Sequence, residues 1–381
     1  NAAYYLLNTN KSISEISYLV GFSTSAYFCN LFKKEYSLTP HEYKKQNSKN
    51  RGPNMKAAYI NRYGNINDVQ LDEQSKPVLT ENDVLIKVHA ASINPLDLRV
   101  LEGEFKAILP IQFPFILGND FAGTVVQVGA NVTQFKVGVE VYAKTDSNGA
   151  FAEYTAVQQS SLALKPQNIS MELATSLPLV SLTAWQALVE IAKVQAGQKV
   201  LIHAGSGGVG SIAIQLAKYL GATVATTTSG KNIRWVKALG ADTIIDYKTT
   251  DFEQVLKDYD VVLDTQGGKT LEKSLNILKR GGRIISISGP PDREFAETIK
   301  ANWLLKCIIP LLSWSIRNKA KKRGITYSFL FMQPNGQQLS EISKLVESGK
   351  INPIVDKTYE FSEITNAFQY VNTGRAKGKL S

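Results

Sequence analysis

The spacing of hydrophobic residues changes along the chain and divides it into segments. From about residue 55 to 157, short apolar runs alternate with turn residues. Within 83–88, strict alternation places Val84, Ile86 and Val88 on one face. Because a period of two is typical of half-buried strands, we predict a β-rich unit in this part of the chain.

The middle of the chain has a different pattern. A short apolar run at 199–203 is followed by a glycine-rich stretch and then by apolar residues at helical spacing, Val209, Ile212, Leu216 and Leu220. We expect further strands at 223–227, 243–246, 260–264 and 283–288, with helical stretches between them. This alternation predicts an α/β unit, a doubly wound parallel sheet flanked by helices.

The N-terminal segment has helical periodicity. Its first apolar set is Ile13, Ile16, Leu19 and Val20, and a turn follows at 21–22. We expect Ser23 to cap a second helix whose inward side chains are Phe28, Leu31 and Phe32. Two helices joined by a tight turn predict a small all-α helix-turn-helix. The polar segment that follows contains Gly and Pro, which favours a linker at 47–54.

Composition narrows the class of protein. The net charge is +10, and residues 1–54 hold seven Lys/Arg against three Asp/Glu, so the basic excess is densest at the N-terminus. A second basic cluster, at 317–323, fits a solvated helix face better than an anion-binding patch. The two cysteines lie far apart, no apolar run approaches about 20 residues, and no signal peptide opens the sequence. We therefore expect a cytoplasmic protein without a membrane partner.

The glycine-rich stretch fits a dinucleotide-binding motif. Gly205, Gly207 and Gly210 have the spacing G-x-G-x-x-G, between a predicted strand and a predicted helix. Such a turn lets the backbone approach a pyrophosphate, whose charge is met by the N–H groups at the helix N-terminus.

The residues after this motif favour NADP(H) over NAD(H). An NAD site usually has an acidic residue about 20 positions beyond the first glycine. Here no acidic residue occurs between Glu190 and Asp242, and the second strand ends near Ser229 and Lys231. Hydroxyl and ammonium groups suit a ribose 2′-phosphate better than a ribose hydroxyl.

The sequence offers no obvious metal site. The three histidines, His41, His89 and His203, are scattered over three segments, and there is no closely spaced cysteine pair. We interpret the histidines as structural and predict no metal. Without a Lewis acid, a quinone or enone is a better hydride acceptor than a simple ketone, because its conjugated system delocalises the added electron pair.

Residues 55–381 resemble the zinc-free medium-chain dehydrogenase/reductase superfamily, in its quinone-oxidoreductase and enone-reductase branch. The matching motifs are AASINPLDL (90–98), LGNDFAG (117–123), LTAW (182–185), HAGSGGVG (203–210) and GRAKGK (374–379). In the zinc-binding branch a Cys falls near Asn94 and a His-Glu pair near Asn119 and Asp120. The departures at these positions agree with a metal-free site.

The resemblance implies a fold and a set of site residues. It implies a GroES-like catalytic domain at 55–178 and 325–381 around a Rossmann NADP-binding domain at 179–324. Asn94 and Asp97 are implied to lie beside the nicotinamide and the substrate. The implied cofactor-binding residues are Thr183, Gly205, Ser206, Gly207, Gly208, Val209, Gly210, Ser229, Lys231, Tyr247, Phe331, Arg375 and Lys377. Phe331 fits plain core equally well. Family members are commonly dimeric, so we expect a homodimer, and the end at Ser381 suggests an altered or truncated C-terminus.

Residues 1–46 resemble the C-terminal helix-turn-helix of AraC-type transcription regulators, the second of the two motifs that these proteins use, through SISEI (12–16), VGF (20–22) and TPHEY (39–43). This resemblance implies that Ser25, Ala26 and Asn30 face the major groove of DNA. Such regulators use two motifs and this chain has one, so we expect any DNA binding to be weak. An appendage that binds nothing stays an open alternative.

Two functions follow from the whole sequence. The first is an NADPH-dependent oxidoreductase that transfers a hydride to a quinone or an α,β-unsaturated carbonyl without zinc. The alternative is a DNA-binding regulator whose reductase-like domain senses NADPH or an electrophile.

Overall fold

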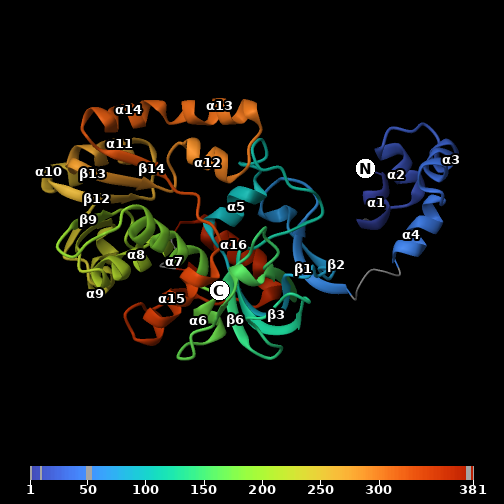
Figure 1. Cartoon of the computed structure of the whole chain (residues 1–381), viewed down its shortest axis with the longest axis horizontal. Helices are drawn as coiled ribbons and strands as arrows, with labels where there is room; N and C mark the ends of the chain where they lie inside the picture. Colours follow the sequence, from blue (N-terminus) through green and yellow to red (C-terminus); the bar gives the residue numbers. More distant parts are fainter. Residues whose placement is uncertain (1, 9–10, 49–53, 375–378, 381) are drawn as a thin grey trace.

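The structure is a computed structural model that describes residues 2–8, 11–48, 54–374 and 379–380. Four N-terminal helices pack on one another (Figure 1), and they are α1 (Ala2–Asn8), α2 (Ile13–Leu19), α3 (Ser25–Tyr36) and α4 (Pro40–Ser48). Their shared core contains Leu6, Ile16, Phe28 and Phe32.

Two details of these helices differ from the sequence prediction. Thr24, not Ser23, caps α3, because its side-chain oxygen accepts a hydrogen bond from the Tyr27 N–H. Leu31 is 38% exposed rather than inward, at the margin of the buried side of the helix that Phe28 and Phe32 form. The segment predicted as a linker is also shorter than expected, because α4 ends at Ser48 and the first strand begins at Asn54.

The β-rich unit contains two antiparallel sheets. The smaller sheet has the order β2-β1-β4, with β1 (Asn54–Ile60), β2 (Gln70–Ser75) and β4 (Phe115–Ile116). The larger has the order β7-β3-β5-β6-β8, with β3 (Asp83–Ser92), β5 (Asp120–Val128), β6 (Glu140–Lys144), β7 (Tyr154–Gln158) and β8 (Ala163–Leu164). The helices α5 (Pro95–Leu101) and α6 (Met171–Ala174) follow strands of this unit.

The C-terminal part of the chain returns to the β-rich unit. Helix α16 (Ile364–Asn372) places Ile364, Ala367 and Phe368 in the same core as residues of β1, β3 and β5. The rings of Phe151 and Phe368 meet edge to face, with centroids 5.8 Å apart. Near it, β15 (Val355–Lys357) pairs in parallel with β16 (Lys379–Leu380), and α15 (Gly336–Glu347) packs against β8. Both ends of the region after residue 54 therefore build one domain, as the GroES-like fold requires.

The middle of the chain forms a six-stranded parallel sheet of order β11-β10-β9-β12-β13-β14, flanked by helices (Figure 1). Its strands are β9 (Lys199–Ile202), β10 (Thr223–Thr228), β11 (Thr243–Asp246), β12 (Tyr259–Asp264), β13 (Leu278–Ser286) and β14 (Thr326–Phe329). The helices are α7 (Pro178–Trp185), α8 (Gly208–Tyr219), α9 (Ile233–Ala238), α10 (Phe252–Val255), α11 (Gly268–Ser274), α12 (Arg293–Thr298), α13 (Trp303–Leu312) and α14 (Trp314–Lys322). The α/β fold with a GroES-like domain and a Rossmann domain is thus confirmed.

One predicted boundary is wrong. The sequence prediction assigned everything after residue 324 to the catalytic domain, but β14 pairs in parallel with β13 and is the last strand of the Rossmann sheet. Its edge position is stabilised by the buried Tyr327, which packs with Ile284 and Ile316 in one hydrophobic cluster.

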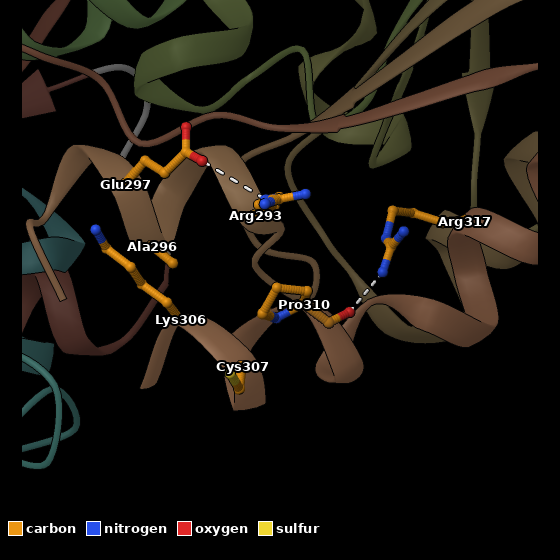
Figure 2. Close-up of a pocket in the computed structure, with 7 residues that line it drawn as sticks. All are labelled: Arg293, Ala296, Glu297, Lys306, Cys307, Pro310 and Arg317. Carbon is orange, nitrogen blue, oxygen red and sulfur yellow. Dashed lines mark hydrogen bonds and ion pairs between the residues drawn. The ribbon is translucent and has the colours of Figure 1, made fainter. Parts of the chain in front are cut away.

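Outside this sheet, a hollow of about 420 Å³ lies between α12 and the pair α13 and α14 (Figure 2).

Candidate functional site: a glycine turn and a buried amide–carboxylate network

The glycine-rich turn joins β9 to α8. The backbone leaves β9 through Ala204, whose φ is +54°, and Gly207 caps α8. A Cβ at Gly210 would lie 2.2 Å from the Ala204 carbonyl oxygen, and a Cβ at Gly205 would lie 2.3 Å from the Thr226 hydroxyl oxygen. Glycine is therefore required for the turn to approach the strand and the helix this closely. The resulting cradle at the start of a 12-residue helix fits the pyrophosphate of a dinucleotide.

The residues predicted to bind the adenosine end come together at the ends of two neighbouring strands. In the parallel pairing of β10 and β11, Thr228 lies opposite Asp246, so Ser229 and Tyr247 follow at the same edge. The backbone N–H of Tyr247 donates to the Thr228 carbonyl at 3.2 Å, and its side chain is 61% exposed. Ser229 is buried, and Lys231 is exposed in the turn that follows. The edge thus offers a hydroxyl, an ammonium and an aromatic ring.

A carboxylate that the sequence reasoning did not consider lies at this edge. A Cβ at Gly230 would stand 2.6 Å from the Asp246 carboxylate oxygen. Asp246 accepts a hydrogen bond from the Lys248 N–H at 3.0 Å, so the carboxylate also holds its own turn. Asp246 lies at the end of β11, one strand beyond the strand end where an NAD-type carboxylate is expected. It is about twice as far from the first glycine in the sequence as that carboxylate would be, so the motif spacing does not point to it.

Asn94 and Asp97 lie in a buried network where α5 begins. The Asn94 N–H donates to one Asp97 oxygen at 2.7 Å, which is the capping contact of this helix. The Asn119 amide donates to the other Asp97 oxygen at 2.7 Å, and the Asn94 amide donates to Asp120 at 3.0 Å. These four side chains are at most 2% exposed. The structure therefore brings both predicted catalytic residues together with Asn119 and Asp120.

Asp120 connects this network to the Rossmann domain. One carboxylate oxygen accepts the Leu179 N–H at 2.9 Å, and the other also accepts the Ser92 hydroxyl at 3.2 Å. Leu179 lies in the first turn of α7, and α7 packs along α8, which begins at the glycine turn. Helix α7 thus links the network to the cofactor cradle.

Lys144 is a second residue that the sequence reasoning missed. It is the cross-strand partner of Asp120 in the pairing of β5 with β6. Burial lowers the pKa of the Lys144 ammonium, although the negative charges of Asp120, Asp146 and Asp97 act in the opposite direction. No motif marks it, since only the antiparallel register brings residue 144 beside residue 120.

For four other predicted cofactor residues the structure gives no sign of a cofactor contact. The Thr183 hydroxyl donates to the Leu179 carbonyl within α7 at 2.7 Å, and the side chain is buried. The Phe331 ring packs edge to face on Phe295, with centroids 5.1 Å apart, which is a core contact. Arg375 and Lys377 lie outside the described residues.

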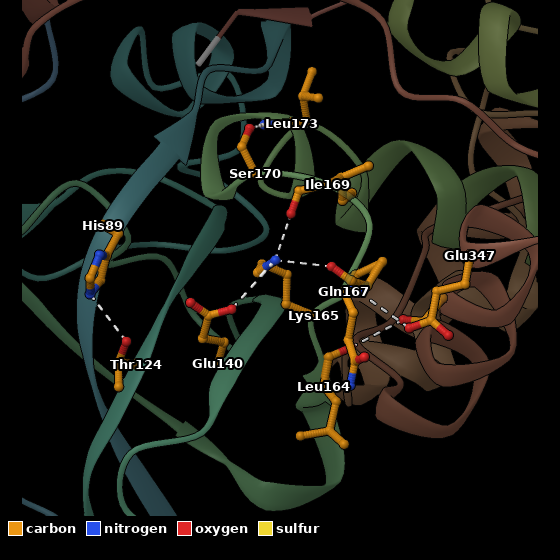
Figure 3. Close-up of polar contacts among 12 residues, drawn as sticks. His89, Thr124, Glu140, Leu164, Lys165, Gln167, Ile169, Ser170, Leu173 and Glu347 are labelled. Atoms are coloured by element: carbon orange, nitrogen blue, oxygen red, sulfur yellow. Dashed lines mark hydrogen bonds and ion pairs between the residues drawn. The ribbon is translucent and has the colours of Figure 1, made fainter. Parts of the chain in front are cut away.

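Two of the histidines, His89 and His203, and a buried lysine have structural partners. His89 contacts the Thr124 hydroxyl at 3.1 Å (Figure 3), and His203 lies between the hydroxyls of Thr227 and Ser274. Buried Lys165 donates to the Ile169 carbonyl at 2.6 Å (Figure 3). It also donates to the Pro166 carbonyl at 2.9 Å. Among the residues that the structure describes, no group of three or more His, Cys, Asp or Glu side chains could hold a metal ion.

The predicted DNA-facing residues lie on α3. Ala26 and Asn30 are exposed on the side of the helix away from Phe28 and Phe32, and Ser25, three residues before Phe28, is partly exposed. Ala26 and Asn30 are therefore accessible on the surface of α3, and contact between these residues and DNA stays a prediction.

Comparison with known proteins agrees with this geometry. Residues 80–167 match the profile of the alcohol dehydrogenase GroES-like domain, residues 239–380 that of a zinc-binding dehydrogenase, and residues 1–46 that of a helix-turn-helix domain. An NADPH-dependent alkenal/one oxidoreductase of Arabidopsis thaliana is 36% identical, over 86% of this chain and 78% of the relative. A 2-methylene-furan-3-one reductase of Solanum lycopersicum is 35% identical over the same shares.

Solved structures lead to the same conclusion. The quinone oxidoreductase of Coxiella burnetii superimposes with a TM-score of 0.74 at 33% identity, over 86% of this chain and 98% of that one. The chain has a glycine-rich cofactor cradle and a GroES-like domain, and its relatives match it over most of their length. It therefore belongs to the medium-chain dehydrogenase/reductase family.

Proposed function

We propose that this oxidoreductase uses NADPH to reduce a quinone or an α,β-unsaturated carbonyl and that it does so without zinc. The glycine cradle supplies N–H groups for the pyrophosphate, and NADP(H) is the cofactor. When bound, it supplies the hydride. The proposal rests most on the residues at the positions where the zinc-binding branch has its ligands, which here are asparagine and aspartate in a closed hydrogen-bond network.

The network argues against a zinc site through its chemistry. Zinc prefers thiolate and imidazole ligands, with carboxylate oxygens as a third choice. Here the amide nitrogens of Asn94 and Asn119 donate to Asp120 and Asp97, so the carboxylates already accept hydrogen bonds from within the network. A conjugated acceptor needs less electrostatic assistance than a plain ketone, because its own π system spreads the negative charge.

The adenosine edge supports NADP(H) over NAD(H). β10 ends in hydroxyl-bearing residues followed by Ser229 and Lys231, and no carboxylate follows it directly. A ribose 2′-phosphate would meet the Lys231 ammonium and the Ser229 hydroxyl there. Tyr247 would offer its ring to the adenine from the neighbouring strand end.

Lys144 is our candidate for the proton donor. Adding a hydride to an enone leaves an enolate, and adding one to a quinone leaves a phenolate, so each product takes up one proton. The Lys144 ammonium lies beside the network that contains Asn94 and Asp97, and burial lowers its pKa toward the working pH. Asp97, whose two oxygens both accept hydrogen bonds, would position the site rather than exchange protons.

The direct test is a panel of initial rates of NADPH and NADH oxidation. Quinones, enones, and saturated ketones and aldehydes of matched size would be compared, with the protein treated with a chelator beforehand. We expect turnover with NADPH and conjugated acceptors, with saturated carbonyls far slower. A faster rate with NADH, or zinc-dependent reduction of saturated ketones, would refute the proposal.

A second candidate function is favoured by the N-terminal match. The helices α1 to α4 lie in the region that matches a helix-turn-helix domain, and α3 has exposed residues, so a DNA-bound reductase domain is the second candidate. The test is selection from a random duplex pool with the full chain, followed by binding at several salt concentrations with and without NADPH. Sequence-specific binding that responds to NADPH, without turnover, would favour a sensor over an enzyme.

A further inference from the structure

Helix α13 has an exposed apolar face. Its inward residues Leu305 and Ile309 pack into a small core with Phe295 of α12. The outward large side chains of α13, together with the first residue of α14, are between 43% and 77% exposed. We call this set the α13 face, and it consists of Trp303, Leu304, Ile308, Leu311, Leu312 and Trp314. These six large apolar side chains, five on α13 and one at the start of α14, form an exposed apolar patch, and exposed patches of this kind often mark interaction sites.

Helix α14 continues this surface with cations. Lys321, Lys322 and Arg323 are exposed, and no carboxylate in the described part of the chain lies within ion-pairing distance of them. The other two basic residues already have partners. Lys319 pairs with Glu272, and Arg317 donates to the Pro310 carbonyl at 2.6 Å, where it holds the end of α13. Figure 1 shows α13 and α14 running one after the other along the outer edge of the Rossmann domain.

The hollow beside α13 is also cationic. It has a volume of about 420 Å³, and Figure 2 shows Arg293, Lys306 and Arg317 around it with a single carboxylate, Glu297. Arg293 and Glu297 form an ion pair at 3.6 Å, so Lys306 and Arg317 keep the hollow positive. Its size and charge suit a phosphate headgroup better than a neutral or acidic one.

From these three features we propose that the α13 face docks on the surface of an anionic phospholipid bilayer. The apolar side chains enter the boundary between headgroups and acyl chains, with a tryptophan at each end of the set, while the α14 cations meet lipid phosphates. Helix α13 lies in the plane of the surface. It has 10 residues, and no helix in the described residues is long and apolar enough to cross a membrane.

Charge complementarity selects the bilayer over a second copy of this chain. In an isologous contact the second copy would present the same surface, the α13 face with Lys306, Lys321 and Lys322, and this set contains no carboxylate for the cations to meet. An anionic bilayer offers the opposite arrangement, with negative charge at its surface and apolar chains beneath. The inference goes beyond the proposed function and does not depend on it, because lipid binding is measured without turnover.

The test is co-sedimentation of the full chain with vesicles of phosphatidylcholine, alone or mixed with phosphatidylglycerol. We expect binding to the mixed vesicles that weakens with added salt. The double variants Leu311→Ser/Trp314→Ser and Lys321→Glu/Lys322→Glu should each lower the partition coefficient at least about tenfold. All four positions are exposed, so folding should be unaffected, and urea unfolding checks this.

Matched controls change exposed residues elsewhere. Val78→Ser replaces an apolar side chain that is 83% exposed, and Lys136→Glu/Lys350→Glu reverses two exposed charges. Both controls should bind vesicles as the unaltered chain does. The proposal is overturned if neither α13-face variant weakens binding, or if light scattering shows that these variants dissociate a dimer while vesicle binding is absent throughout.

Discussion

Replacing Gly210 by Ala tests the close packing at the cofactor cradle. The added Cβ would lie 2.2 Å from the Ala204 carbonyl oxygen and 3.0 Å from the Gly205 Cα, both of them backbone atoms. Side-chain rotation cannot relieve this overlap, so the turn has to move by about 1 Å, at a typical overpacking cost of about 1–3 kcal/mol. The better helix propensity of Ala returns about 1 kcal/mol. We expect a net loss of up to about 2 kcal/mol in the free energy of unfolding, together with weaker NADPH binding.

Gly207→Ala separates folding from cofactor binding at the same turn. Here the Cβ would meet one atom, the Ala204 carbonyl oxygen at 3.3 Å, and the backbone has extended angles that any residue adopts. The cost of Ala at this helix cap is about 0.5–1 kcal/mol. The added methyl group would nevertheless keep the pyrophosphate away from the N–H groups of α8. We expect at least a tenfold rise in the Kd for NADPH, or about 1.4 kcal/mol.

The assay pairs urea unfolding with NADPH titration, followed by the change in nucleotide fluorescence. Gly210→Ala should lose both stability and affinity, whereas Gly207→Ala should lose mainly affinity. Unaltered NADPH affinity in Gly207→Ala would refute the assignment of this turn to the pyrophosphate. A gain of about 1 kcal/mol in the stability of Gly210→Ala, which is the helix-propensity effect without any clash, would refute the packing argument.

Three further predictions concern charge. Lys231→Glu places a carboxylate where the 2′-phosphate would bind. It should therefore lower kcat/KM for NADPH by more than about tenfold and leave kcat/KM for NADH within about threefold. Equal losses with both cofactors would contradict this prediction. Lys144→Met should lower kcat with an enone by about 10²-fold or more. It should also abolish the decline of kcat that occurs as the pH rises through the Lys144 pKa. The exposed control Lys136→Met should change neither kcat nor its pH dependence. Burial lowers the pKa of His203 to about 4. As the pH falls from 6.5 to 4, the unfolded chain therefore binds a proton at this residue and the native state does not, so the free energy of unfolding decreases as the pH falls through this range. Between pH 7 and pH 5 this loss is about 2 kcal/mol, and urea unfolding of His203→Gln should show it reduced.

Periodicity and motif spacing predicted the main elements of the fold. The strands at 223–227, 243–246 and 260–264 appear within one residue of the prediction at each end, because strands buried in a parallel sheet are short apolar runs that turns interrupt. The cradle was predictable because two of its three glycines, Gly205 and Gly210, fulfil a steric requirement that no other residue type meets.

Other features could not be predicted because they depend on pairing between distant segments. Strand β14 joins the Rossmann sheet through its register with β13, and its own sequence does not reveal which domain it enters. Lys144 lies beside Asp120 through the antiparallel register of two strands. The sequence indicated Asn94 and Asp97 through a family motif, but the hydrogen bonds to Asn119 and Asp120 required the fold.

The central claim is metal-free hydride transfer from NADPH to a conjugated acceptor. Chelator-treated protein would be given an enone and NADPH that carries deuterium on the transferable position of the nicotinamide, and the product would be analysed by mass spectrometry. The account predicts one deuterium in each molecule of reduced product, at a rate that added zinc does not change. Product without deuterium, or turnover that appears on adding zinc, would contradict it.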